Sequence, residues 1–323
     1  MGRIDRLGRG AGYGAALILT PYLLIKVSSV VGALLGLLPT GSGLGLVQWV
    51  VLNAATIVMA AIGIALALAL VRPWGLRIPA PPLVFCGWVA AGFLVSMLPY
   101  VLLRSFWQSP GPSNAANTHD SGGATAPGWE DALIQLSFVG MGVGLAVALP
   151  AYLRRRWPHA FTGRLGDGAR SGGAERGRLV WQRWMLLAGP AVGLVWLYWA
   201  AGGTSGLSHP SDRDGNWRTL DLVFGLWAFI GSAAVWVAAR GRPAPLPRWL
   251  PMTLGCLGSG ALFAWSAWML PFTAYAAVAG RTAGSVMPEN LAVAAVLHGA
   301  AVLAGATMLR SLLRTYARLA GSV

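Results

Sequence analysis

The chain has 323 residues, of which 56% are hydrophobic and only 11% are charged, whereas soluble domains carry about 25% charged residues. So few charges cannot cover a water-facing surface, which excludes an ordinary soluble domain. The net charge of +14 would suggest a nucleic-acid partner in a soluble protein. Here the enrichment of basic residues in the cytoplasmic loops of membrane proteins is a sufficient cause, and we expect no nucleic acid.

Eight apolar segments follow one another along the chain. Each is long enough to cross a hydrocarbon core of about 30 Å as a helix, the fifth only just. The segments are Tyr13–Leu38, Leu46–Val71, Leu83–Leu103, Trp129–Leu153, Trp184–Ala201, Leu220–Ala239, Leu250–Val278 and Leu291–Leu313. The sequence therefore predicts an all-α, polytopic integral membrane protein. The Arg- and Gly-rich stretch 154–183 is predicted to be a cytoplasmic linker between two four-helix units, 1–153 and 184–323.

The basic residues indicate the orientation of these spans. With a cytoplasmic N-terminus, 19 of the 24 basic residues fall in cytoplasmic segments and only Arg104, Arg213, Arg218 and Arg281 fall outside. This bias follows the positive-inside rule and predicts that both termini are cytoplasmic. Lys26 is the sole lysine, and such a preference for arginine is typical of a GC-rich bacterial genome. We therefore expect a multi-pass protein of a bacterial inner (plasma) membrane.

Short matches between the two halves suggest an internal repeat. Met97–Tyr100 (MLPY) lies near the end of the third span, and Met269–Phe272 (MLPF) lies near the end of the seventh. The second and sixth spans both run into an Arg-Pro pair, at Arg72 and at Arg242. A unit of four spans begins and ends on the same side of the membrane. Two copies would therefore be parallel repeats, related by an axis along the membrane normal.

The segment Leu197–Leu207 reads LYWAAGGTSGL. Over one span and its outer turn it resembles a motif, roughly YWxxGG(x)xG, of small uncharacterised four-helix bacterial membrane proteins, the DUF3995 group. The whole chain resembles a longer actinobacterial membrane protein built as a tandem duplication of such a unit. The first half departs from the motif, because Lys26–Ser29 (KVSS) stands where the second half has Tyr198–Ala201 (YWAA). The resemblance implies a fold and no activity.

Two polar side chains are predicted at membrane mid-depth. Lys26 lies near the middle of the first span, where a charge costs from about 3 kcal/mol upward, and Asn53, Thr56, Gln135 and His298 are the partners we consider. Lys26 serves either as an anion site or proton relay, or as a hydrogen-bonded residue that specifies helix packing. For His298 the favoured interpretation is a hydrogen-bonded core histidine, and a functional role is the alternative.

Acidic residues concentrate in the predicted outer segments, where Glu130, Asp221 and Glu289 begin or precede spans. Helix N-termini stabilise carboxylates, which is one sufficient explanation. In the alternative, some of these acids line an outward cavity, where apolar walls raise a carboxyl pKa and create a general acid. Asp221 is the strongest candidate because Trp217 and Trp227 lie close to it in sequence.

The chain contains 16 tryptophans. An interfacial aromatic belt together with core packing explains most of them. Clustered rings can also line a pocket for an isoprenoid and stabilise a carbocation through their faces. The predicted substrate-binding residues are Lys26, Trp196, Trp199, Trp227, Trp265, Trp268 and His298.

The sequence holds no Walker loop, GxSxG, HExxH or Cys/His cluster, and we expect neither a metal nor a cofactor. Three functions remain. The first is an intramembrane enzyme, such as a terpene cyclase, that acts by acid catalysis on an isoprenoid-like, lipid-soluble substrate and uses Asp221, Glu130 or Glu289 as proton donor. The second is a transporter or channel with its site between the repeats, and the third is a structural or accessory subunit. The enzyme is favoured because mid-membrane polar residues are few. The expected partners are membrane lipids and an apolar small molecule.

Overall fold

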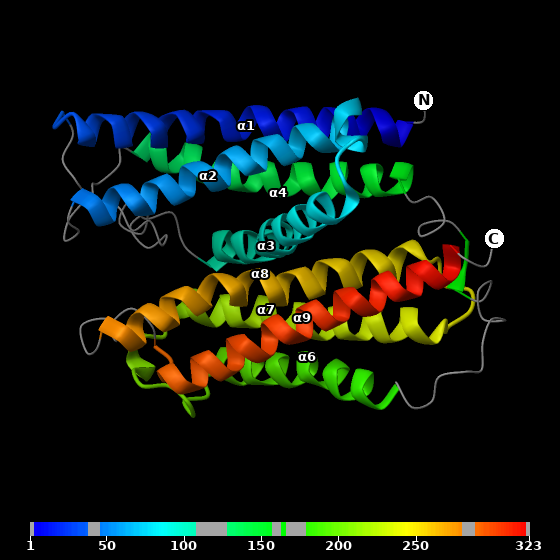
Figure 1. Cartoon of the computed structure of the whole chain (residues 1–323). Coiled ribbons are helices and arrows are strands. Elements are labelled where there is room, and N and C mark those ends of the chain that lie inside the picture. The colour runs from blue at the N-terminus through cyan, green and yellow to red at the C-terminus, as the bar shows by residue number, and fades with distance from the viewer. Residues whose placement is uncertain are drawn as a thin grey trace. The chain divides into compact units, whose positions relative to one another are not determined.

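A computed structural model describes residues 3–37, 46–107, 128–156, 163–165, 179–279 and 288–320. Within these residues the regular secondary structure is helical (Figure 1), which confirms the all-α prediction. The long helices are α1 (Arg3–Leu34), α2 (Leu46–Val71), α3 (Ala80–Trp107), α4 (Gly128–Arg156), α6 (Leu179–Ala200), α7 (Gly215–Arg240), α8 (Trp249–Ala279) and α9 (Leu291–Ala320). Two short 3-10 helices, η1 (Pro73–Leu76) and η4 (Pro210–Asp212), lie in connections.

Seven of the described helices are long and apolar enough to cross a membrane, namely α1, α2, α3, α4, α7, α8 and α9. In α6 the apolar helix found among the described residues is Leu187–Ala200, which is shorter than the roughly 20 residues of a typical span. The chain is therefore an integral membrane protein of multi-pass character. Of the eight predicted spans, these seven helices account for all except the fifth.

The outward faces of the helices are apolar. On α2, for example, Val47, Val51, Val58 and Ile62 are each more than 40% exposed. In water such a contiguous apolar face would require a covering partner, whereas lipid tails solvate it directly. The helix backbones satisfy their own hydrogen bonds, as a hydrocarbon environment requires.

Contacts between Cα atoms divide the chain into two compact units. Unit 1 comprises Met1–Val84 and Ser105–Tyr152, and unit 2 comprises Phe85–Arg104 and Leu153–Val323. Unit 1 is built on the packing of α1 with α2, joined by most of α4. Unit 2 contains α6, α7, α8 and α9, which pack on one another, together with the central part of α3. The boundary between the units at residue 153 coincides with the predicted end of the first half. Phe85–Arg104, which contains most of the third predicted span, belongs to unit 2.

Glycines allow the helices of unit 2 to approach one another closely. A Cβ atom on Gly92 of α3 would lie only 2.2 Å from the backbone carbon of Gly260 in α8. Beside this crossing, the indole N–H of Trp88 donates to the Ser259 hydroxyl at 3.0 Å and to the Cys256 carbonyl at 3.1 Å. Small residues at such crossings bring backbones into contact where no hydrophobic effect drives association. The repeat relation between the two halves remains a prediction.

Candidate functional site

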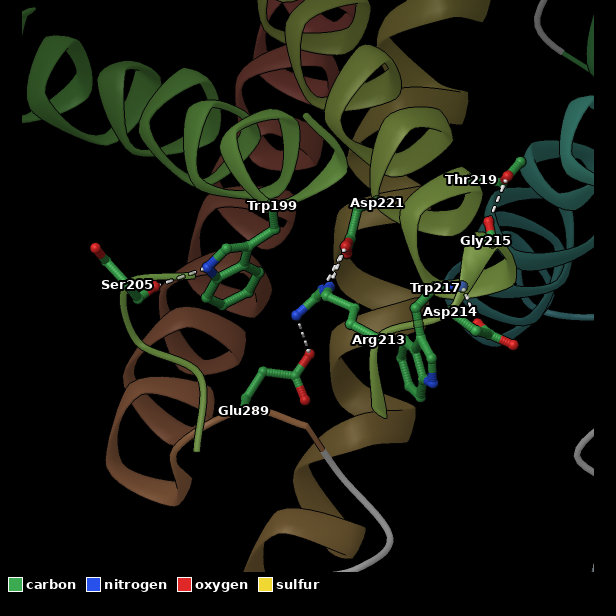
Figure 2. A network of polar contacts seen from close by, with 9 residues as sticks. All are labelled: Trp199, Ser205, Arg213, Asp214, Gly215, Trp217, Thr219, Asp221 and Glu289. Carbon is green, nitrogen blue, oxygen red and sulfur yellow. Dashed lines mark hydrogen bonds and ion pairs between the residues drawn. The ribbon is translucent and has the colours of Figure 1, made fainter. Parts of the chain in front are cut away.

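A buried charged cluster lies at the end of unit 2 where α7 and α9 begin (Figure 2). The Arg213 Nε donates to Asp221 Oδ2 at 2.9 Å, and Arg213 Nη2 donates to the same oxygen. Arg213 Nη1 lies 3.4 Å from Glu289 Oε1. The guanidinium carbon lies 4.6 Å from the centre of the Trp199 ring. Arg213, Asp221 and Glu289 are only 5%, 7% and 6% exposed, so their charges interact with little screening by water.

The connection between α6 and α7 folds back to place Arg213. It turns at Gly202 and Gly206, whose φ angles of 99° and 85° favour glycine. The Trp199 indole N–H donates to the Ser205 carbonyl at 2.9 Å and holds the turn against α6. The Asn290 N–H donates to the Gly206 carbonyl at 2.9 Å, and Leu207 pairs with Glu289 in an isolated bridge. The loop is thereby fixed to the segment that leads into α9, and Glu289 faces the arginine.

Asp221 and Glu289 do not cap the helices. The N-cap of α7 is Asp214, whose Oδ1 accepts a hydrogen bond from the Trp217 backbone at 3.0 Å. At the start of α9, Asn290 Oδ1 accepts from the Ala292 backbone at 3.0 Å. The explanation that helix N-termini hold these acids therefore applies to Asp214 and not to Asp221 or Glu289. Both carboxyls are instead committed to Arg213.

One guanidinium faces two buried carboxyl groups, so the cluster carries a surplus negative charge when both acids are ionised. Burying an unneutralised charge is costly, and a proton on one carboxyl removes that cost. Asp221 receives both hydrogen bonds from Arg213. Among the described residues, Glu289 Oε2 and Arg213 Nη1 have no hydrogen-bond partner. Burial raises the pKa of Glu289 above its ordinary value, and the nearby guanidinium opposes this shift without cancelling it. The two hydrogen bonds from Arg213 favour the ionised form of Asp221, so the geometry favours Glu289 as the carboxyl that carries a proton.

An aromatic cluster lies next to the charged one in unit 2. Phe224 stacks on Trp265 with ring centroids 4.8 Å apart, and Trp196 lies 6.5 Å from the His298 ring. His298 Nδ1 lies 3.1 Å from the Ser266 hydroxyl, and both side chains are buried. The wider cluster contains Trp199 and, packed against it, Trp217 and Trp227. Five of the six predicted binding residues in unit 2 therefore lie in or against this aromatic cluster, namely Trp196, Trp199, Trp227, Trp265 and His298.

The other predicted site residues lie elsewhere. In unit 1, Lys26 Nζ donates to Asn53 Oδ1 at 3.3 Å and lies 5.9 Å from the Tyr22 ring centre, which confirms Asn53 as its partner. Trp268, in α8, is 38% exposed. Glu130 lies in the first turn of α4 in unit 1, and its side chain is outside the described residues. Asp221 and Glu289 are thus the two predicted acids that the described structure places on one partner.

That partner, Arg213, was not predicted. One feature of the sequence pointed to it, because Arg213 is a basic residue in a predicted outer segment and lies between Asp212 and Asp214. Among the described residues no group of three or more His, Cys, Asp or Glu is arranged to hold a metal ion. The chemistry that the cluster itself offers is the holding and release of a proton at Glu289.

Comparison with known protein families, curated proteins and solved structures finds no match to this chain. The class of protein therefore rests on the seven membrane-compatible helices, which define a multi-pass integral membrane protein. The Arg213 cluster and the aromatic side chains around it are the features of this protein that point to a more specific function.

Proposed function

We propose that the chain is an intramembrane enzyme in which Glu289 acts as a general acid toward a lipid-soluble substrate. One observation carries this proposal. Glu289 Oε2 is buried and has no hydrogen-bond partner among the described residues, and the adjacent guanidinium is already bound by Asp221. A neutral carboxylic acid with one oxygen free is the form that donates a proton.

Each neighbour has a role in this mechanism. Arg213 orients Glu289 through its Nη1, and the Asp221 carboxylate neutralises the guanidinium, so that the positive charge does not strip the proton from Glu289. The guanidinium also lies over the Trp199 ring, which restricts its position. Asp221, which the sequence favours as the acid, becomes a positioning residue, because Arg213 occupies it.

An isoprenoid is the substrate class that this arrangement suits. Transfer of the Glu289 proton to an alkene carbon forms a C–H bond from the π electrons and leaves a carbocation. An indole face stabilises positive charge, as the Trp199 ring does for the Arg213 guanidinium. Loss of a proton from another carbon, back to the Glu289 carboxylate, gives a cyclised or isomerised product and regenerates the acid. No cofactor is consumed in this cycle.

The proposal includes the membrane arrangement that the enzyme requires. α6 would be a further span and would bring the total to eight, because its 22 residues extend about 33 Å at 1.5 Å per residue. α6 packs on both α7 and α9 in unit 2. With eight spans both termini are cytoplasmic, and the Arg213 cluster faces the outer side of a bacterial plasma membrane. The tandem repeat of a DUF3995-like unit is part of the same proposal.

The test compares organic extracts of host membranes that contain the wild-type chain, E289Q or D212N. Asp212 is the matched control, because it is an exposed acid from the same end of unit 2. Mass spectrometry should find an apolar product with the wild-type chain and D212N, and should not find it with E289Q. D221N should reduce the product less than E289Q does. Identical extracts from all the variants and from an empty-vector host would refute acid catalysis by Glu289.

A further inference from the structure

The far end of α7 carries a second arrangement of charge and aromatic surface. Arg240 is the last residue of the helix, and its guanidinium carbon lies 3.9 Å from the centre of the Trp236 ring. Trp236 is 48% exposed, and Arg240 is exposed as well. We infer that Arg240 and Trp236 form a binding site for the phosphate group of an anionic phospholipid.

The position along α7 matches a lipid headgroup. The helix has 26 residues and extends about 39 Å, which is close to the thickness of a bilayer with its headgroup regions. The Arg213 cluster lies at the start of α7, which the positive-inside rule predicts at the outer surface. Arg240 therefore reaches the opposite surface, which is the predicted cytoplasmic side. Tryptophan and arginine at the end of a span are typical of the membrane–water interface.

The site lies on an exposed, largely apolar face of α7. Leu226, Ile230 and Trp236 are each between 41% and 48% exposed. The opposite face, with Phe224 and Val235, is buried in unit 2. A lipid whose acyl chain runs along Leu226 and Ile230 would place its headgroup beside Trp236 and Arg240. An apolar chain joined to a phosphate matches the order of side chains on this helix.

Charge complementarity favours an anionic headgroup. Arg242, just after the helix, and Arg310 and Arg314 of α9 are also exposed. α7 and α9 end at the same side, because Val235 and Ala238 pack with Met308 and Leu312. The described acids of unit 2 are Asp212, Asp214, Asp221 and Glu289, and all four lie at the starts of α7 and α9. In the described part of the chain, this end of unit 2 is therefore uniformly positive.

The stacked geometry explains why Arg240 is the central residue. A guanidinium that rests its face on an indole keeps its N–H groups in the plane, where they can bind two phosphate oxygens at once. Arg240 makes no ion pair with any described residue. Stacking also restricts the side chain before the lipid binds, which lowers the entropy lost on binding.

The experiment measures lipid binding to the full-length chain in detergent by native mass spectrometry, with phosphatidylglycerol and phosphatidylcholine as probes. Wild type should bind phosphatidylglycerol more tightly. R240Q should bind phosphatidylglycerol about fivefold more weakly, as expected for one arginine at an anionic surface. R218Q is the control, because Arg218 is an exposed arginine near the start of the same helix; it should bind as wild type does. W236L should also bind phosphatidylglycerol more weakly than wild type. The fold-loss of affinity in W236L/R240Q should be smaller than the product of the fold-losses in the two single variants.

Three outcomes would overturn the inference. R240Q and R218Q binding phosphatidylglycerol equally well would remove Arg240 from the site. Equal binding of phosphatidylcholine by wild type would show that no anionic group is recognised. Displacement of the lipid by an equal concentration of inorganic phosphate would identify free phosphate as the ligand instead.

Discussion

Replacement of Arg213 by methionine tests the electrostatic basis of the site. Arg213 gives two hydrogen bonds to Asp221, approaches Glu289 at 3.4 Å and stacks on Trp199. R213M keeps the apolar length of the side chain and leaves Asp221 buried without its partner. Removal of one partner from a buried ion pair costs about 3–5 kcal/mol. The free energy of unfolding of R213M should therefore be lower than that of wild type by this amount.

The free energy of unfolding can be measured in mixed micelles with an increasing fraction of denaturing detergent. R218M serves as the control, because Arg218 is exposed, and this variant should stay within about 0.5 kcal/mol of wild type. R213M/D221L should recover most of the loss, since an apolar pair of similar volume replaces buried charges at little cost. R213M as stable as wild type, or R213M/D221L less stable than R213M, would refute the reasoning.

Three further predictions concern other parts of the chain. Because the folded state holds the Glu289 proton more tightly than the unfolded chain does, the thermal midpoint of wild type should fall as pH rises from the ordinary glutamate pKa, about 4.3, through the raised pKa. In E289Q this fall should be smaller than in wild type. G92A should lower the free energy of unfolding by about 1–3 kcal/mol, whereas G14A should not, because a Cβ at Gly14 meets nothing within 4 Å. In a double-mutant cycle, K26M and N53L should couple by about 0.6 kcal/mol, and strictly additive effects would argue against the hydrogen bond.

Hydropathy predicted the helices well, because apolar length is a local property of the chain. The second predicted span and α2 share the same bounds, Leu46–Val71. Other helices extend past their predicted spans through polar residues, where hydropathy gives no signal. α1, for example, begins at Arg3 and not at Tyr13. The grouping of Phe85–Arg104 with unit 2 was not predictable in this way, because it depends on the Gly92–Gly260 crossing between helices far apart in the sequence.

The candidate site was predictable only in part. Asp221 and Glu289 stand out as acids beside apolar spans, and the sequence identifies both. Their pairing depends on Arg213, a loop residue whose position follows from the turn at Gly202 and the bridge between Leu207 and Glu289. Such long-range placement leaves no local pattern in the sequence, so the hint from an arginine in a predicted outer segment did not suffice.

The stability of E289Q distinguishes a general acid from a purely structural clamp, in which the ion pairs of Arg213 only hold the α6–α7 connection in place. In a clamp both carboxyls are ionised, and removal of the Glu289 charge would weaken the cluster by a large fraction of the 3–5 kcal/mol expected for a buried pair. If Glu289 carries a proton, glutamine replaces a neutral group of the same shape, and the free energy of unfolding at neutral pH should change by less than about 1 kcal/mol. Loss of product with unchanged stability in E289Q therefore indicates the acid. A large loss of stability indicates that Arg213, Asp221 and Glu289 serve to hold the α6–α7 connection against α9.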